Sequence, residues 1–332
     1  MTILKKCAIA ATVFILVAGN AFSSLPSVTE VDRASAHRAL MAVSFDDEFG
    51  IAVGTSGQIK ESKDAGDTWE VKENELRLGL LGVDVKGEVA IAVGQLGQIL
   101  LRNSDENWEP IESGTEERLL SVSIGNGDQE AAAVGSFGAV VMTRDGGKTW
   151  ASIAPDWEKM FPEQGFGFAP HLYAVQMLKP GEIFLAGEMG LVLRSDDYGA
   201  SWALVRRGKM SANLGEERSP SIFALHIRDD GIGYAVGQEG TILQTRDHGM
   251  NWLELNSGTK SILLGVSSES SGSVLVVGRY AMLASPDDGS SWISFSDPKV
   301  ISAWYSGVDR AGAGEGKGVI VVGDSGLILK LD

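Results

Sequence analysis

The stretch Thr143-Arg-Asp-Gly-Gly-Lys-Thr-Trp150 decides the fold, because it recurs along the chain as (Ser/Thr)-x-Asp-x-Gly-x-(Ser/Thr/Asn)-Trp. The hydroxyl and the carboxylate can bond the backbone N–H groups of a tight turn, and the glycine can adopt the left-handed conformation. We expect each Asp to stabilise its own turn rather than to act as a catalytic acid or metal ligand. Each Trp should begin a strand and bury its ring between repeat units. The residues concerned are Asp64, Trp69, Asp145, Trp150, Asp197, Trp202, Asp247, Trp252, Asp287 and Trp292.

A second pattern, Val-Gly-x-x-Gly or a near variant, accompanies these elements and lies between two alternating apolar runs. Because glycine adopts positive φ without steric cost, the pattern predicts a hairpin turn between the second and third strands of a unit. The first glycines are Gly54, Gly94, Gly135, Gly187, Gly237, Gly278 and Gly323.

The spacings between these glycines are 40, 41, 52, 50, 41 and 45 residues. A period of about 40–50 residues with four short strands per unit is typical of a β-propeller. Seven signatures predict seven blades, although the Asp element of the second unit (residues 103–108) is degenerate and Ala281 stands near the second glycine of the sixth. The inner strands are predicted at residues 40–45, 80–85, 119–124, 172–178, 222–228, 262–267 and 303–308.

The last unit has three strand-like runs, at residues 304–308, 318–322 and 327–331, and no fourth. Residues 27–31 alternate like a strand but belong to no full unit. We expect this N-terminal strand to complete the last blade, because closure removes both exposed sheet edges. The sequence therefore predicts an all-β, seven-bladed propeller of four-stranded antiparallel blades, as a single domain over residues 22–332.

The first 21 residues have the pattern of a secretory signal peptide. Lys5 and Lys6 precede an apolar run at residues 8–18, and cleavage is expected after Ala21, with a retained N-terminal anchor as the alternative. Cys7, the only cysteine, precedes the apolar run and so is not placed as a lipid-attachment cysteine. The mature chain needs no disulfides and is expected in the periplasm.

The charge of the chain is strongly acidic, with 28 basic and 44 acidic residues and a net charge of −16. This balance argues against nucleic acid and anionic membrane surfaces as main partners. The four histidines show no metal-ligand spacing, so no metal or other cofactor is expected. The predicted inner strands carry only Asp84, His226 and Arg228 as ionisable groups, too few for a catalytic site, and we predict no enzyme.

Two of the spacings are long because of extra residues between a Trp strand and the next inner strand. Both loops, residues 155–171 and 206–220, should emerge on the face with the glycine turns and flank the same blade. Loops on a rigid scaffold often carry function, so an aromatic loop beside a basic loop predicts a protein-binding site. The candidates are Trp157, Phe161, Phe166, Phe168, Arg206, Arg207 and Lys209. In the alternative, the aromatic residues pack down as a lid and the basic residues are only solvated.

A weaker candidate set lies just before the inner strands, where residues would converge near one mouth of the channel. It adds Arg38, Arg77 and Arg118 to the partner-binding candidates, with His171 and Lys260 at related positions.

The Asp element is the Asp box, or bacterial neuraminidase repeat. With seven units and the glycine turns at residues 53–57, 134–138 and 236–240, the chain closely resembles the photosystem II stability/assembly factor family of β-propellers. The resemblance implies a non-enzymatic chaperone, in the periplasm or, in a photosynthetic source, the thylakoid lumen. It also implies a membrane-protein complex subunit as partner.

Two alternatives remain open. A sialidase-like glycoside hydrolase is also built from Asp boxes and would use a tyrosine nucleophile, for which Tyr173 and Tyr305 are placed on inner strands. A glycan-binding propeller would use Trp157 and its neighbours as a stacking platform. We expect a monomer.

Overall fold

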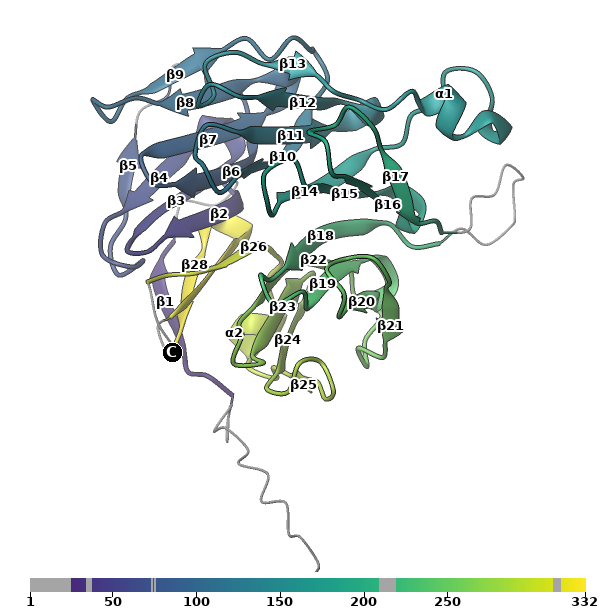
Figure 1. Ribbon diagram of the computed structural model, residues 1–332. Coiled ribbons are helices and arrows are strands. Elements are labelled where there is room, and N and C mark those ends of the chain that lie inside the picture. The colour runs from purple at the N-terminus through teal and green to yellow at the C-terminus, as the bar shows by residue number, and fades with distance from the viewer. Residues whose placement is uncertain (1–24, 34–37, 73, 75, 209–218, 313–317) are drawn as a thin grey trace, which may run out of the picture.

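The computed structural model describes residues 25–33, 38–72, 74, 76–208, 219–312 and 318–332. These residues form seven four-stranded antiparallel sheets, arranged in a ring with one strand of each sheet lining a central channel (Figure 1). The fold is therefore the seven-bladed β-propeller that the repeats predict. Short helices α1 (Trp157–Met160) and α2 (Pro298–Ile301) lie outside the sheets.

Within a blade, the strands follow sequence order from the channel outward. The first three blades contain β2 (Leu40–Asp46), β3 (Phe49–Gly54), β4 (Ile59–Ser62) and β5 (Glu70–Lys72); β6 (Leu80–Lys86), β7 (Val89–Gly94), β8 (Ile99–Arg102) and β9 (Trp108–Ile111); and β10 (Leu119–Ile124), β11 (Ala131–Gly135), β12 (Val140–Thr143) and β13 (Ala151–Ser152). The next three contain β14 (Leu172–Met177), β15 (Ile183–Gly187), β16 (Val192–Ser195) and β17 (Ala203–Arg206); β18 (Ile222–Ile227), β19 (Gly233–Gly237), β20 (Ile242–Thr245) and β21 (Leu253–Leu255); and β22 (Leu263–Ser268), β23 (Val274–Gly278), β24 (Ala281–Ser285) and β25 (Ile293–Ser294).

The seventh blade joins the two ends of the chain. It orders β1 (Val28–Asp32), β28 (Ile328–Leu331), β27 (Val319–Gly323) and β26 (Tyr305–Arg310), and β1 lies alongside β28 in Figure 1. Strand β1 pairs antiparallel with β28, with Val28 opposite Leu331. The predicted closure by an N-terminal strand is thus confirmed. The seventh inner strand, β26, begins and ends two residues later than predicted, which brings Asp309 and Arg310 into the channel wall.

The core is divided into seven apolar clusters, and each cluster lies between two neighbouring blades. The second strand of a blade, such as β11, is buried along its whole length because neighbouring blades cover both of its faces. The tryptophans of the Asp elements pack into these clusters, as Trp150 does between the second and third blades. Apolar burial between units therefore holds the ring together.

In the six turns that carry both glycines, the two positions require glycine for different reasons. The second, such as Gly138 with φ of 70°, has the left-handed conformation that the sequence analysis gave for both. The first is extended, with φ of −168° at Gly135, so that explanation is wrong for it. Instead, a Cβ added at Gly135 would lie 1.9 Å from the carbonyl oxygen of Arg118, and the corresponding distance is between 1.9 and 2.3 Å in all seven blades. Close backbone approach thus requires the first glycine.

Asp145 shows how the Asp element closes its turn. Its Oδ1 accepts hydrogen bonds from the Thr143 hydroxyl (2.7 Å) and the Thr149 backbone N–H (2.9 Å), and its Oδ2 accepts from the Thr149 hydroxyl (2.6 Å). The hydrogen bonds from Thr149 lower the pKa of Asp145 to about 2. The same arrangement occurs at Asp64, Asp197, Asp247 and Asp287. In the degenerate second unit, the Asn103 side chain accepts from the backbone of Asp105 and Asn107, both at 3.0 Å.

Candidate protein-binding face

One end of the ring carries the seven glycine turns together with the connections between blades, and we call it the turn face. The turns and connections are joined by backbone hydrogen bonds, such as that from Ser136 N–H to the carbonyl of Arg118 (2.9 Å). The opposite end, which carries the Asp elements, is called the Asp end. Both long loops leave their blades at the turn face, where the sequence predicts them.

The aromatic loop packs down onto the blades. Asp156 caps helix α1 by accepting from the Lys159 backbone N–H (3.0 Å), and this places Trp157 over the third blade. Only 8% of Trp157 is exposed, and its Nε1–H donates to the carbonyl of Gly138 (3.1 Å). The ring stacks on Phe161, which is fully buried, at a centroid distance of 6.3 Å. Trp157 and Phe161 therefore belong to the core, as the lid alternative expects.

The other two aromatic residues of this loop lie nearer the surface. Phe168 is partly buried with its ring edge-on to Phe161, at 5.7 Å. Phe166 has 97% of its surface exposed. Of the four predicted aromatic residues, Phe166 is thus the one whose ring is fully available to a partner.

The basic loop is tied to the aromatic loop. Arg207 forms an ion pair with Glu163 and stacks its guanidinium over the Phe161 ring at 5.6 Å. Arg206 donates to the carbonyl of Gly190, and burial lowers its pKa. The two loops therefore adjoin, as predicted, while Lys209 lies outside the described residues.

The arginines that precede the inner strands reach the surface of the turn face. Arg38, Arg77 and Arg118 are exposed, and none has an ion pair within the described part of the chain. Lys260, in the same position before the sixth blade, is also exposed. These side chains provide positive charge on an acidic protein.

An aromatic strip that the sequence analysis missed crosses this face. Phe137, at the tip of the third glycine turn, contacts His171 at 4.8 Å, and its backbone N–H donates to His171 Nδ1 (3.1 Å). The strip continues through Tyr173 to Phe223, whose rings are 4.9 Å apart on the inner strands of the fourth and fifth blades. It therefore runs from the rim to the mouth of the channel.

The turn tips also expose apolar side chains. Phe137 is 64% exposed, and Leu96, at the same position in the second blade, is 71% exposed. Both residues have positive φ, which a bulky side chain rarely adopts and which glycine or asparagine would adopt more easily. This choice of residue at the turn tip was a signal in the sequence, and it favours a role for these side chains at the surface.

The structure separates the residues named for the two alternative functions. Tyr305 is fully buried and cannot reach a sugar, whereas Tyr173 is partly exposed; the buried Trp157 offers no face for sugar stacking. Within the described ranges, no group of three or more histidine, cysteine, aspartate or glutamate residues could hold a metal ion. The described residues also contain no helix that is long and apolar enough to cross a membrane.

The repeats, the closed ring and the exposed turn face define a β-propeller of the Asp-box class. The chain belongs to the Photosynthesis system II assembly factor YCF48 family, whose model matches residues 27–157 and 101–252. Photosystem II assembly lipoprotein Ycf48 from Synechococcus sp. (strain CC9902) is 31% identical over 124 residues, which is 34% of this chain and 36% of that protein. The match thus spans about a third of the relative's length.

Solved structures resemble the chain over nearly its whole length. "YCF48 bound to D1 peptide" has a TM-score of 0.69 at 17% identity and covers 94% of this chain and 96% of that one. YCF48 from Cyanidioschyzon merolae has a TM-score of 0.69 at 20% identity, covering 92% and 98%. The WD40 propeller domain of Doa1 has a TM-score of 0.67 at 14% identity, covering 92% and 97%, so this likeness extends beyond the family and shows the fold alone.

Proposed function

We propose that the chain is an exported, non-enzymatic assembly factor that binds a segment of a membrane-protein complex subunit on its turn face. The family is one of photosystem II assembly factors, and one structural neighbour is a YCF48 bound to a D1 peptide. The apolar run of the predicted signal peptide, residues 8–18, supports export to the periplasm, or to the thylakoid lumen in a photosynthetic source.

The observation that carries the proposal is the set of exposed apolar and basic side chains on the turn face. Leu96, Phe137 and Phe166 have most of their surface in water, beside Arg77 and Arg118. Burying each apolar side chain would contribute about 1.5–3 kcal/mol, which gives a gross total of about 5–9 kcal/mol. Association itself costs about 4 kcal/mol or more, so micromolar binding also needs polar contacts. The arginines can supply these contacts to carboxylates of the partner.

The test is affinity purification with cross-linking from native membranes, followed by mass spectrometry. The test variant combines Phe137→Ser and Phe166→Ser, and the matched control is Leu253→Ser, which alters a 66% exposed side chain on the outer strand β21. We expect the wild type and the control to recover a membrane-complex subunit, and the double variant to recover about tenfold less at an unchanged melting temperature. Equal recovery by all three proteins would refute the assignment of the turn face.

A further inference from the structure

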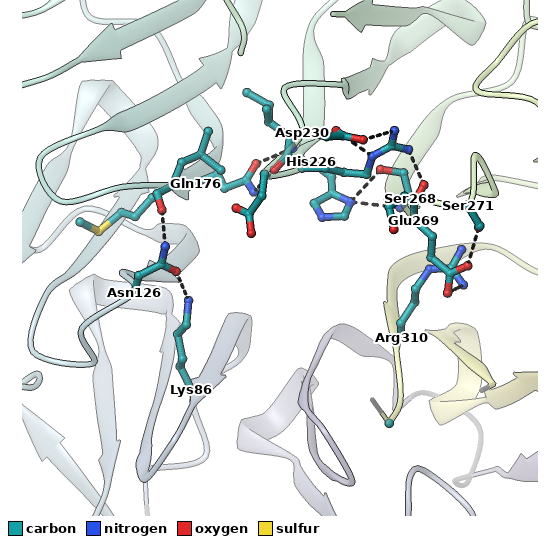
Figure 2. A pocket seen from close by; sticks show the side chains of 16 residues that line it. Lys86, Asn126, Gln176, His226, Asp230, Ser268, Glu269, Ser271 and Arg310 are labelled. Atoms are coloured by element: carbon teal, nitrogen blue, oxygen red, sulfur yellow. Dashed lines mark hydrogen bonds and ion pairs between the residues drawn. The ribbon is translucent and has the colours of Figure 1, made fainter. Parts of the chain in front are cut away.

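A cavity of about 740 Å³ opens at the channel mouth of the Asp end, away from the turn face (Figure 2). It lies where the inner strands end, and its lining includes Lys86, His226, Arg228, Glu269 and Arg310. A volume of this size suits a small molecule, since ligand pockets range from about 300 to 1,000 Å³. The ionisable lining distinguishes it from the apolar part of the channel nearer the turn face, which is lined by residues such as Leu81, Phe223 and Leu264.

His226 presents a hydrogen-bond donor to this cavity. Its Nδ1 accepts from the backbone N–H of Ser268 (3.0 Å), which can only donate, so the ring proton is on Nε2. Burial, together with the positive charges of Arg310 and Arg228, lowers the pKa of His226 to about 4. The imidazole is therefore neutral near pH 7. Figure 2 shows the ring between Gln176 and Ser268, with Lys86 and Arg310 approaching the same space from the other side.

Lys86 adds a second donor to this side of the cavity, and the Arg310 guanidinium adds a positive charge. Arg310 donates from Nη1 to Glu269 (2.6 Å) and from Nη2 to Ser273 (3.3 Å), but its buried Nε–H has no acceptor among the described residues. Lys86 donates to Asn126 Oδ1 (2.6 Å), which leaves other ammonium protons for a ligand. A carboxylate in the cavity could accept from Lys86 and from His226 Nε2.

The carboxylates of the lining differ in how many hydrogen bonds they already accept. Asp230 accepts from Arg228 with both oxygens (3.2 and 2.8 Å), and Glu269 accepts from Arg310 and from the Ser271 hydroxyl (3.0 Å). Asp229 is exposed and makes no hydrogen bond or ion pair within the described ranges, so it remains available for a cation.

The lining carries three cations (Lys86, Arg228 and Arg310) and three carboxylates (Asp229, Asp230 and Glu269), so it has no net charge to attract a bare anion. Free donors and a free carboxylate around one cavity suit a ligand that carries both charges. We propose that this cavity binds a small zwitterion of the amino-acid type. Its carboxylate would meet His226 Nε2 and Lys86, and its ammonium group would meet Asp229.

The proposal can be tested by isothermal titration calorimetry at low ionic strength. The probes are the twenty L-amino acids, with acetate and methylamine as single-charge probes. The variants are Lys86→Met and Asp229→Asn, which change side chains at the cavity edge, and the control is Lys148→Met, which removes an exposed cation on the Asp end outside the cavity. A ¹⁵N spectrum of the His226 ring provides a second readout, because a bound carboxylate should shift Nε2.

We expect at least one amino acid to bind one-to-one with a Kd below about 1 mM and to shift the His226 Nε2 resonance. Lys86→Met and Asp229→Asn should each weaken binding by about tenfold or more, and Lys148→Met by less than about twofold. Failure of all twenty amino acids to bind at about 10 mM would overturn the proposal. Binding of acetate as tight as that of the amino acids would overturn the zwitterion assignment. So would equal binding by all variants.

Discussion

Replacing Gly135 with alanine tests whether close backbone approach, rather than conformational freedom, fixes the first glycine of each turn. The backbone at Gly135 is extended, so alanine meets no conformational penalty there. The added Cβ would lie 1.9 Å from the Arg118 carbonyl oxygen and 2.8 Å from its carbonyl carbon. Because a close carbon–oxygen contact is about 3.3 Å, the first two strands of the blade must separate locally by about 1.4 Å.

The cost has two parts. Separation breaks the hydrogen bond from Ser136 N–H to Arg118, which is worth about 1 kcal/mol. The forced backbone shift adds about 1–3 kcal/mol of strain. We expect Gly135→Ala to lower the free energy of unfolding by about 2–4 kcal/mol and, for a chain of this size, the melting temperature by about 4–8 °C.

The matched control is Gly127→Ala in the same blade, where the added Cβ would meet no atom within 4 Å. Because alanine has less conformational freedom than glycine in the unfolded chain, this variant should be neutral or about 0.4–1 kcal/mol more stable than the wild type. Both free energies can be measured by urea unfolding followed by tryptophan fluorescence. If the two variants differ by less than about 0.5 kcal/mol, the close-approach explanation is wrong.

Two other substitutions test buried charges. Asp32→Ala should lower the free energy of unfolding by about 3 kcal/mol, because it removes the ion-pair partner (2.7 Å) of Lys60, whose side chain is only 4% exposed. Adding Lys60→Met removes the unpaired charge and should restore most of this loss, as measured by urea unfolding. A double variant no more stable than Asp32→Ala would contradict the explanation. Burial raises the pKa of Asp309 to about 7, so the folded protein holds this proton more tightly than the unfolded chain does. The stability that the protonated carboxyl contributes is fully present below about pH 4 and is lost as the pH rises through 7. Asp309→Asn should therefore gain stability relative to the wild type between pH 5 and about 8 in urea unfolding, and parallel pH profiles would refute the assignment.

The repeat pattern predicted the strands, the number of blades and the ring closure because these depend on local turn chemistry and on strand alternation. Completion of the last blade by residues 27–31 followed from counting strands in that unit, and the structure adds the register, with Val28 opposite Leu331. The end of the seventh inner strand was misplaced because the connection between the first two strands of the last blade, residues 311–318, is longer than in the other blades. Asp309 and Arg310 were consequently left out of the channel.

The candidate site was harder to predict, because burial within a loop depends on contacts with other blades. Trp157 and Phe166 are both aromatic and belong to the same loop, yet one is buried and the other is exposed. The difference arises because Trp157 finds an acceptor in the carbonyl of Gly138, on a neighbouring turn. Composition indicated a loop that the structure places on the turn face, but it could not separate the buried residues that anchor the loop from those that a partner can reach.

The pairing of β1 with β28 also imposes an order on folding. The first strand leaves the ribosome ahead of the rest, but its partner, β28, is made after all the other strands. Until then, the growing ring has two open sheet edges and an uncovered apolar face on its first blade, both of which favour aggregation. The entropy of joining the two ends must also be paid before the final contacts form. The chain is therefore most prone to aggregation in the interval before β1 and β28 pair.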